Sequence, residues 1–140
     1  MTNLQKLTEY FTAQAAIKAD IARVNNILVA NGMKQVGAQY TGFKRYIYVV
    51  EKIGPSAIES FSIADEMMTY AVQDYGSDYN YYTIPVSYLD LTDEQVVAQL
   101  KRIAEAMEAA TANAKKQADA AKDKADYELY QKLKAKFDKD

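Results

Sequence analysis

The sequence predicts an α+β fold, in which a small antiparallel sheet lies between a long N-terminal helix and a long C-terminal helix. Apolar residues recur at helical spacing near the start of the chain. The middle of the chain is rich in Gly, Tyr and β-branched residues, which favours turns and strands. No Gly or Pro occurs after Pro85, so nothing interrupts helical periodicity from there to residue 140.

The first helix is expected over residues 3–31. Thr2 or Asn3 can cap its start, and Gly32 suits the position just after its end. A helix of this length measures about 43 Å. The residues that define its apolar face lie three, four or six positions apart: Leu4, Leu7, Phe11, Ile17, Ile21, Val24 and Leu28.

The middle of the chain is expected to form a hairpin, a short helix and one further strand. The hairpin strands are placed at 34–40 and 44–52, on either side of Thr41-Gly42. A short helix is predicted over about 62–74, because the segment from Ser62 to Asp65 resembles a helix start. The last strand is placed at 81–88, and Pro85 predicts an edge strand because proline cannot donate to a ladder.

The C-terminal helix is expected over 93–137, after a capping box formed by Thr92 and Gln95. Its length would be about 68 Å, whereas a compact chain of this size is only about 35–40 Å across. The helix must therefore project, fold back as a hairpin near Thr111 to Asn113, or pack against another chain. We accordingly divide the chain into an α+β domain, 1–92, and the long helix, 93–140.

The composition of this helix favours self-association in the manner of a coiled coil. Ten of the 22 residues from 104 to 125 are alanine, which stabilises a helix and permits close approach of a second one. Bulky apolar residues lie at the two ends of the same stripe, so the sequence predicts a homo-oligomer. The residues assigned to this contact are Leu100, Ile103, Met107, Ala114, Ala121, Leu129 and Leu133.

Residue types that the chain lacks exclude several classes of enzyme. There is no Cys and no His, so thiolate chemistry, Ser-His-Asp triads and the commonest zinc sites are ruled out. The acidic pairs Asp65-Glu66 and Asp93-Glu94 fall in predicted first turns of helices, where they complement the helix dipole. We therefore expect no enzyme activity, no catalytic residues, no metal and no cofactor. No signal peptide or membrane span is visible, which predicts a cytoplasmic protein.

The charged residues are unevenly distributed, although the net charge is only −2. Between Lys52 and Lys101 there are eight acids and no base, and six of the twelve tyrosines fall between residues 70 and 88. Exposed Tyr is common at protein interfaces, so this block suits a basic partner. An alternative is that these rings pack on the protein's own sheet. The predicted partner-binding residues are Asp74, Tyr75, Asp78, Tyr79, Tyr81 and Tyr82.

Other kinds of partner are less favoured by the sequence. Lys44-Arg45 lies beside Phe43 and Tyr46 and could contact nucleic acid, but the chain is acidic overall and has no dominant basic segment. Membrane-surface binding by the C-terminal helix is disfavoured because its apolar face is largely alanine.

In general character the chain is similar to small bacteriophage accessory proteins. It is short, rich in Tyr, and ends in a charged helix with the segment Tyr130-Gln131-Lys132-Leu133-Lys134-Ala135-Lys136-Phe137. This resemblance covers the C-terminal third and implies a protein that binds and modulates a host factor in the host cytoplasm. It implies no site residues.

Three functions follow as hypotheses. The first is a modulator or inhibitor of a protein, which docks through the acidic Tyr-rich block. The second is an oligomer that binds or sequesters a nucleotide-like small molecule, with Tyr rings stacking on it and Lys44, Arg45 or Arg102 holding its phosphates. The third is a structural or assembly subunit.

Overall fold

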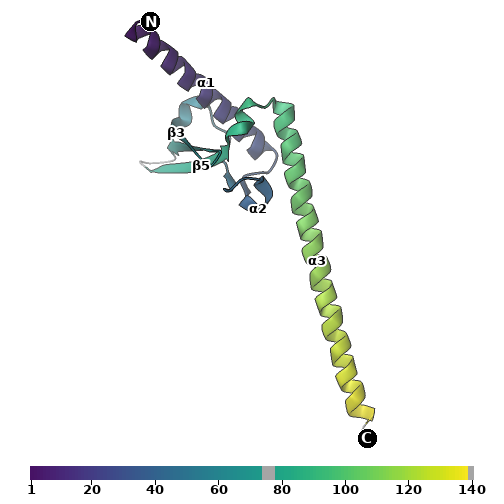
Figure 1. Cartoon of the computed structure of the whole chain (residues 1–140). Coiled ribbons are helices and arrows are strands. Elements are labelled where there is room, and N and C mark those ends of the chain that lie inside the picture. The colour runs from purple at the N-terminus through teal and green to yellow at the C-terminus, as the bar shows by residue number, and fades with distance from the viewer. Residues whose placement is uncertain (74–77, 139–140) are drawn as a thin grey trace. The chain divides into compact units, whose positions relative to one another are not determined.

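The computed structural model describes residues 1–73 and 78–138, and it confirms the α+β class (Figure 1). Helix α1 (Asn3–Ala30) precedes a five-stranded antiparallel sheet, and helix α3 (Asp93–Asp138) follows it. The chain divides into two units, Met1–Ile103 and Ala104–Asp140. The first contains the sheet and its core. The second consists of the remainder of α3.

Helix α1 has the ends that the sequence predicts. Thr2 and Gln5 form a capping box, in which each backbone N–H donates to the other residue's side chain, at 2.8 and 3.1 Å. At the other end Gly32 has a φ of 75°, and the N–H groups of Gly32 and Met33 donate to Val29 and Leu28. This is a Schellman motif, whose left-handed position glycine adopts without steric cost.

Only the C-terminal half of α1 packs on the sheet. Ile21, Val24 and Leu28 are fully buried, whereas Leu4 and Phe11 belong to a first half that is mostly exposed. Since the predicted apolar face is continuous, one part of it covers the core and the other part is uncovered in the single chain.

The sheet has the strand order β1-β2-β5-β4-β3, with every neighbouring pair antiparallel. Three long strands make up most of it, and two short ones extend it. Short helical turns connect these strands. The bounds are β1 Gln35–Val36, α2 Ala38–Thr41, β2 Ile47–Tyr48, η1 Pro55–Ala57, β3 Ile58–Ala64, β4 Met67–Gln73, β5 Tyr79–Pro85 and η2 Val86–Asp90.

The predicted short helix over 62–74 is wrong. Strands β3 and β4 occupy this region and form a hairpin with a two-residue turn at Asp65 and Glu66, whose φ values are 53° and 65°. Turns of this kind usually carry Asn-Gly, which the sequence lacks here. Strand β4 lies between two strands and is buried almost throughout, so its apolar residues do not alternate with polar ones. Their spacing therefore resembles that of a helix.

The predicted hairpin over 34–52 is confirmed only in its antiparallel pairing. Strands β1 and β2 have two residues each, and α2 with the loop after it takes the place of a tight turn at Thr41-Gly42. The hydroxyl group of Thr41 organises this loop, because it contacts the carbonyls of Ala38 and Arg45 and accepts from the N–H of Phe43 at 3.0 Å.

The edge position predicted for the last strand is also wrong, because β5 is the central strand of the five. Pro85 is the final residue of β5, and on the β2 side the pairing is limited to Thr83 opposite Tyr48. The missing N–H of Pro85 therefore interrupts no ladder, which is why proline is tolerated in this central strand.

Helix α3 is continuous from Asp93 to Asp138 and begins at the predicted capping box of Thr92 and Gln95. Its first turns belong to the sheet-containing unit, where Val96, Leu100 and Ile103 are buried. At the predicted weak point, the Thr111 hydroxyl donates to the Met107 carbonyl at 2.9 Å. Because α3 is one unbroken helix, the alternative that it folds back as a hairpin near Thr111 is wrong.

Candidate interaction surfaces

The exposed end of strand β5 carries three of the predicted partner-binding residues. Tyr79 and Tyr81 are 49% and 66% exposed, and Asp78 just before them is exposed as well. Both rings lie on the same face of the strand, since alternate residues of a strand share a face. We call Asp78, Tyr79 and Tyr81 the tyrosine surface. Asp74 and Tyr75, which were assigned to the same site, lie outside the described residues.

Tyr82 does not belong to the tyrosine surface, which corrects the prediction for this residue. It is 5% exposed, its ring stacks on Tyr48 with centroids 5.0 Å apart, and it lies 5.9 Å from Tyr70. Position 82 falls on the opposite face of β5 from Tyr79 and Tyr81, because the side-chain period of a strand is two. For Tyr70 and Tyr82, the alternative that the tyrosines pack on the protein's own sheet is therefore the correct one.

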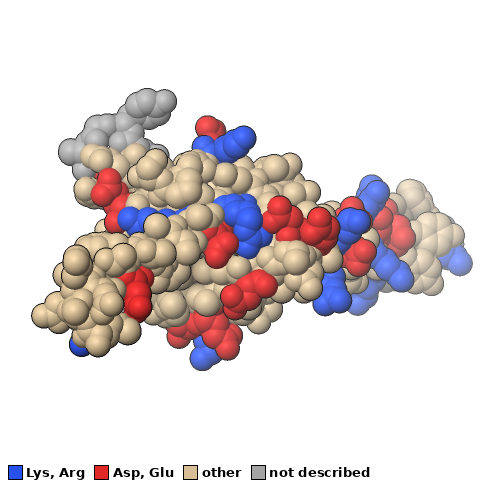
Figure 2. All heavy atoms as spheres, turned by 90° about the horizontal axis from the view of Figure 1, so that it is seen from above, with Lys and Arg blue, Asp and Glu red and all other residues tan. Residues whose placement is uncertain are grey.

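Arginines from earlier in the chain neutralise part of the acidic block. Arg45 contacts Asp65 at 3.2 Å, and Arg23 contacts Asp93 at 2.7 Å. Both pairs are partly exposed, so each contributes little to stability. Asp78 has no salt bridge among the pairs formed by the described residues. On the face in Figure 2, bases are interspersed with acids, and no basic area dominates.

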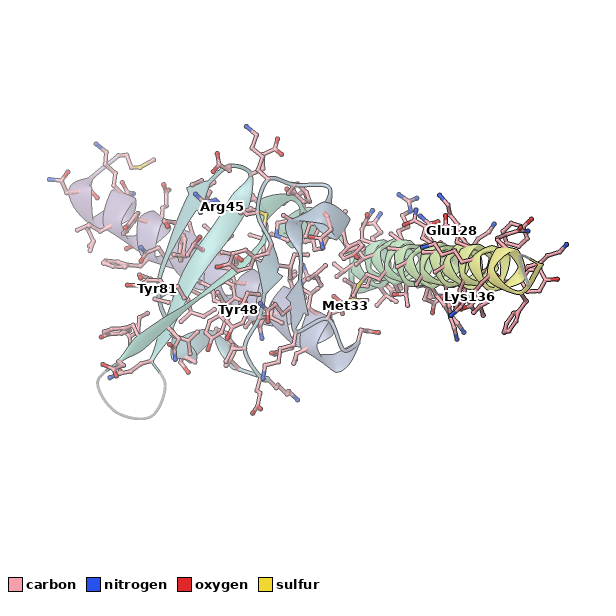
Figure 3. The ribbon with its side chains drawn as sticks, turned by 90° about the horizontal axis from the view of Figure 1, so that it is seen from below. Met33, Arg45, Tyr48, Tyr81, Glu128 and Lys136 are labelled. Atoms are coloured by element: carbon pink, nitrogen blue, oxygen red, sulfur yellow. The ribbon has the colours of Figure 1, made fainter. Side chains whose placement is uncertain are left out.

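The segment predicted to contact nucleic acid lies apart from the tyrosine surface. Figure 3 shows Arg45, Tyr48 and Tyr81 at separate places on the sheet-containing unit. Because the Arg45 guanidinium is engaged by Asp65, it is not a free phosphate ligand. Sequence reasoning could not detect this pair, since 20 positions separate the two residues.

The residues assigned to self-association divide between the two units. Leu100 and Ile103 are 2% and 5% exposed and belong to the core of the first unit, so their assignment to an oligomer contact is corrected. Met107 is half-buried. Ala114, Ala121, Leu129 and Leu133 are all exposed, as is every described residue from 111 to 137. Large apolar side chains exposed near the end of α3 are Tyr127, Leu129, Tyr130, Leu133 and Phe137.

A cavity with a volume of about 420 Å³ lies beside the Tyr48–Tyr82 stack. Lys34 and Lys52 line it and could hold an anion, but Glu51 lines it too and offsets half of their charge. None of the bases proposed for a nucleotide phosphate, Lys44, Arg45 or Arg102, lines it. The cavity therefore adds no support for a nucleotide site.

Two exposed regions were not singled out from the sequence. One is the first half of α1, whose stripe was expected to face the core. The other is the edge strand β3, which was hidden by the incorrect helix prediction. The length of α1 was a usable signal, because a helix of about 43 Å exceeds what a small sheet can cover.

The acidic side chains of the described residues do not gather into a metal-binding group. Among residues 1–73 and 78–138, no group of three or more acidic side chains lies close enough to bind a metal ion. Burial raises the pKa of Tyr70, and the nearby Tyr82 raises it further; burial also raises the pKa of Tyr88. Both rings are buried in the core, so these shifts reflect packing. None of the described helices has both the length and the apolar character of a membrane span.

Comparison of the chain with protein-family models, with curated proteins and with solved structures found no match.

Proposed function

We propose that this chain is a non-enzymatic binding protein that modulates or inhibits a basic protein, which docks on the tyrosine surface. The accessory proteins of bacteriophages, which the sequence resembles, suggest a host protein as the target and the host cytoplasm as the place of action. The C-terminal part of α3 holds copies of the chain together.

The observation that carries this proposal is the exposure of Tyr79 and Tyr81 beside Asp78, which forms no salt bridge with another described residue. A large ring left in water loses the free energy that burial would give it, and Tyr is enriched where proteins bind one another. Lysine and arginine side chains of a partner can stack on such rings while they approach the Asp78 carboxylate. Since no base occurs between Lys52 and Lys101, the chain's own sequence near this surface supplies no competing cation.

The proposed role of α3 depends on its exposed stripe. Leu129, Leu133 and Phe137 recur every four residues and continue the alanine stripe that includes Ala114 and Ala121. Residues four apart lie on the same side of a helix. A second α3 packed along this side would bury the bulky residues near the C-terminus, and the alanines would allow close approach.

The docking proposal is tested by affinity capture with two versions of the protein. Extracts of the cell in which the protein acts would be passed over the wild type and over a variant with Tyr79→Ala, Tyr81→Ala and Asp78→Lys. We expect a basic protein to bind the wild type and to be lost from the variant by at least tenfold, because the rings and the carboxylate carry the contact.

The matched control carries Tyr46→Ala and Tyr127→Ala, which remove two exposed rings elsewhere in the chain. It should retain the partner. Binding should also weaken as salt is raised from about 50 to 500 mM, since charge attraction is screened. Equal capture by the wild type and the tyrosine-surface variant would refute the proposal.

A further inference from the structure

Strand β3 forms an edge of the sheet, and most of its residues are exposed. Within residues 1–73 and 78–138, β4 is the strand that pairs with it, and its other side faces no strand. The regular part of β3 lies between a bulge at Glu59 and the turn at Asp65, and it consists of the five residues from Ser60 to Ala64. They contain no charge, Pro or Gly. Natural proteins usually protect such an edge with charges or cover it with another segment.

The exposed half of α1 extends past this same edge. The buried half of α1 packs on the sheet, where Asn25 accepts a hydrogen bond from the hydroxyl of Tyr70 on β4. Farther toward its N-terminus, α1 lines a cavity of about 420 Å³ together with Phe61 of β3. The residues before this cavity therefore continue beyond the edge, as Figure 1 shows. The exposed apolar side chains of the first half of α1 are Leu4, Leu7, Tyr10 and Phe11, and Tyr10 also lines the cavity.

We propose that a second copy of the chain pairs with this edge, β3 against β3 in antiparallel order, and that it also covers the first half of α1. The proposal is independent of the tyrosine surface and of α3. The two five-stranded sheets would join into one of ten strands. Because a two-fold axis perpendicular to the sheet keeps both helices on the same face, the projecting half of each α1 would lie over the partner.

The side chains favour one register for this pairing. If Ser62 lies on the two-fold axis, Phe61 of each copy lies opposite Ile63 of the other. Both residues are on the α1 face of the sheet, because they pair with Tyr70 and Met68 of β4. Ile63 is 63% exposed in the single chain, so the pairing would give it an apolar neighbour. At each end of the paired segment, Ser60 of one copy lies opposite Ala64 of the other, and both side chains are small.

A second copy is the occupant that explains both exposed regions together. An extended peptide could satisfy the edge alone, but it would leave the stripe of Leu4, Leu7 and Phe11 uncovered. A stable interface takes about 800 Å² from each partner, and the edge strand together with the two-turn apolar stripe of α1 gives a larger contact than the edge alone. An isologous contact also needs no further component, because the same patch serves on both sides.

The pairing is tested by cross-linking, which is direct because the chain has no Cys. In the full-length Ser62→Cys variant, two copies would bring their thiols to the axis, with Cα atoms about 4.5–5.5 Å apart, a separation that a disulfide can span. Mild oxidation should convert most of the protein into a reducible dimer on a denaturing gel. Ser87→Cys is the control: Ser87 is exposed but lies outside β3, and it should remain monomeric on the gel.

A second variant tests the same contact without a covalent bond. Ile63→Lys places a charge on the edge at an exposed position, so the fold should be retained, as checked by circular dichroism. In a chain that also carries Leu129→Lys and Leu133→Lys, so that α3 does not hold copies together, Ile63→Lys should halve the number of chains per particle in sedimentation equilibrium. Failure of Ser62→Cys to cross-link beyond the Ser87→Cys control, or an unchanged mass when Ile63→Lys is added to that chain, would overturn the proposal. Neither result would bear on the tyrosine surface.

Discussion

At the scale of single residues, two adjacent asparagines of α1 connect the helix to the rest of the core. The Asn25 amide donates to the Val50 carbonyl at 3.0 Å and accepts from the Val50 N–H at 3.1 Å. Asn26 makes the same two bonds to Ile53, at 2.8 and 2.9 Å. These side chains replace the strand partner that the backbone of this segment lacks. Each of these part-buried bonds contributes on the order of 1 kcal/mol, and leaving a partner unsatisfied costs more.

Tyr70 completes this network, and its burial predicts a pH dependence of stability. Its pKa in the folded state is raised above the ordinary value of 10.0, chiefly by burial. Above pH 10 the unfolded chain therefore loses the Tyr70 proton while the folded chain keeps it. The stabilisation is complete below pH 10 and is lost as the pH rises further, by up to about 1.4 kcal/mol per pH unit.

The Tyr70→Phe variant separates this effect from that of the other tyrosines. At pH 8 it should be less stable than the wild type by about 1–2 kcal/mol, because the hydrogen bond to Asn25 is lost. Between pH 10 and 11 the difference should shrink, since Phe has no proton to lose. Urea unfolding at a series of pH values measures both quantities, and a difference independent of pH would contradict the argument.

At the scale of elements, the β3–β4 hairpin has a turn that its sequence does not favour. Asp65 and Glu66 both have positive φ, which costs a residue with a Cβ atom about 1–2 kcal/mol in each case. The turn persists because β4 is held between β3 and β5 and its Met67 and Met68 side chains are buried. Tertiary packing thus overrides a local preference.

Replacement of Glu66 by Gly should relieve part of this strain. Glycine adopts positive φ freely, and Glu66 is exposed, so little contact is lost. We expect the free energy of unfolding to rise by about 0.5–1 kcal/mol in urea titrations. Gly54→Ala is a useful comparison, because φ at Gly54 is −94° and the substitution introduces no positive-φ strain. A loss of stability in Glu66→Gly would show that the turn is not strained.

At the scale of the whole molecule, helix α3 contributes residues to both units. The first turns of α3 complete the core of Met1–Ile103 through Val96, Leu100 and Ile103. The remaining turns carry an exposed apolar stripe and make no core of their own. Since an isolated helix gains little stability from its backbone, most helices depend on packing of an apolar face. For the end of α3, a second chain is the partner that we propose.

The double substitution Leu129→Lys and Leu133→Lys should abolish association through α3. It places two charges on the apolar stripe and leaves the first unit unchanged. Light scattering should show fewer chains per particle than for the wild type. Ala120→Lys with Gln131→Lys adds the same charge on the opposite side of the helix, about 180–200° from Leu129 at 100° per residue, and should behave as the wild type. Equal masses for both variants would contradict self-association through this stripe.

Elements whose signals are local were predicted well from the sequence. The capping boxes at Thr2 and Thr92 involve residues three positions apart, and the helix end at Gly32 depends on a single backbone conformation. Tyr79 and Tyr81 are exposed, and their part in binding a partner stays a prediction. By contrast, the β3–β4 hairpin was missed, because its turn lacks the usual residues and its buried strand has no alternation.

The sequence by itself determined the α+β class, the two long helices with their caps, and the absence of Cys and His chemistry. These properties follow from composition and from contacts between residues near one another in the chain. Only the tertiary structure decided that β5 is central, that Tyr82 and Leu100 are buried, and that Arg23 and Arg45 neutralise part of the acidic block. Each of these depends on which distant segments meet, and the side-chain period of a strand cannot be assigned until its neighbours in the sheet are known.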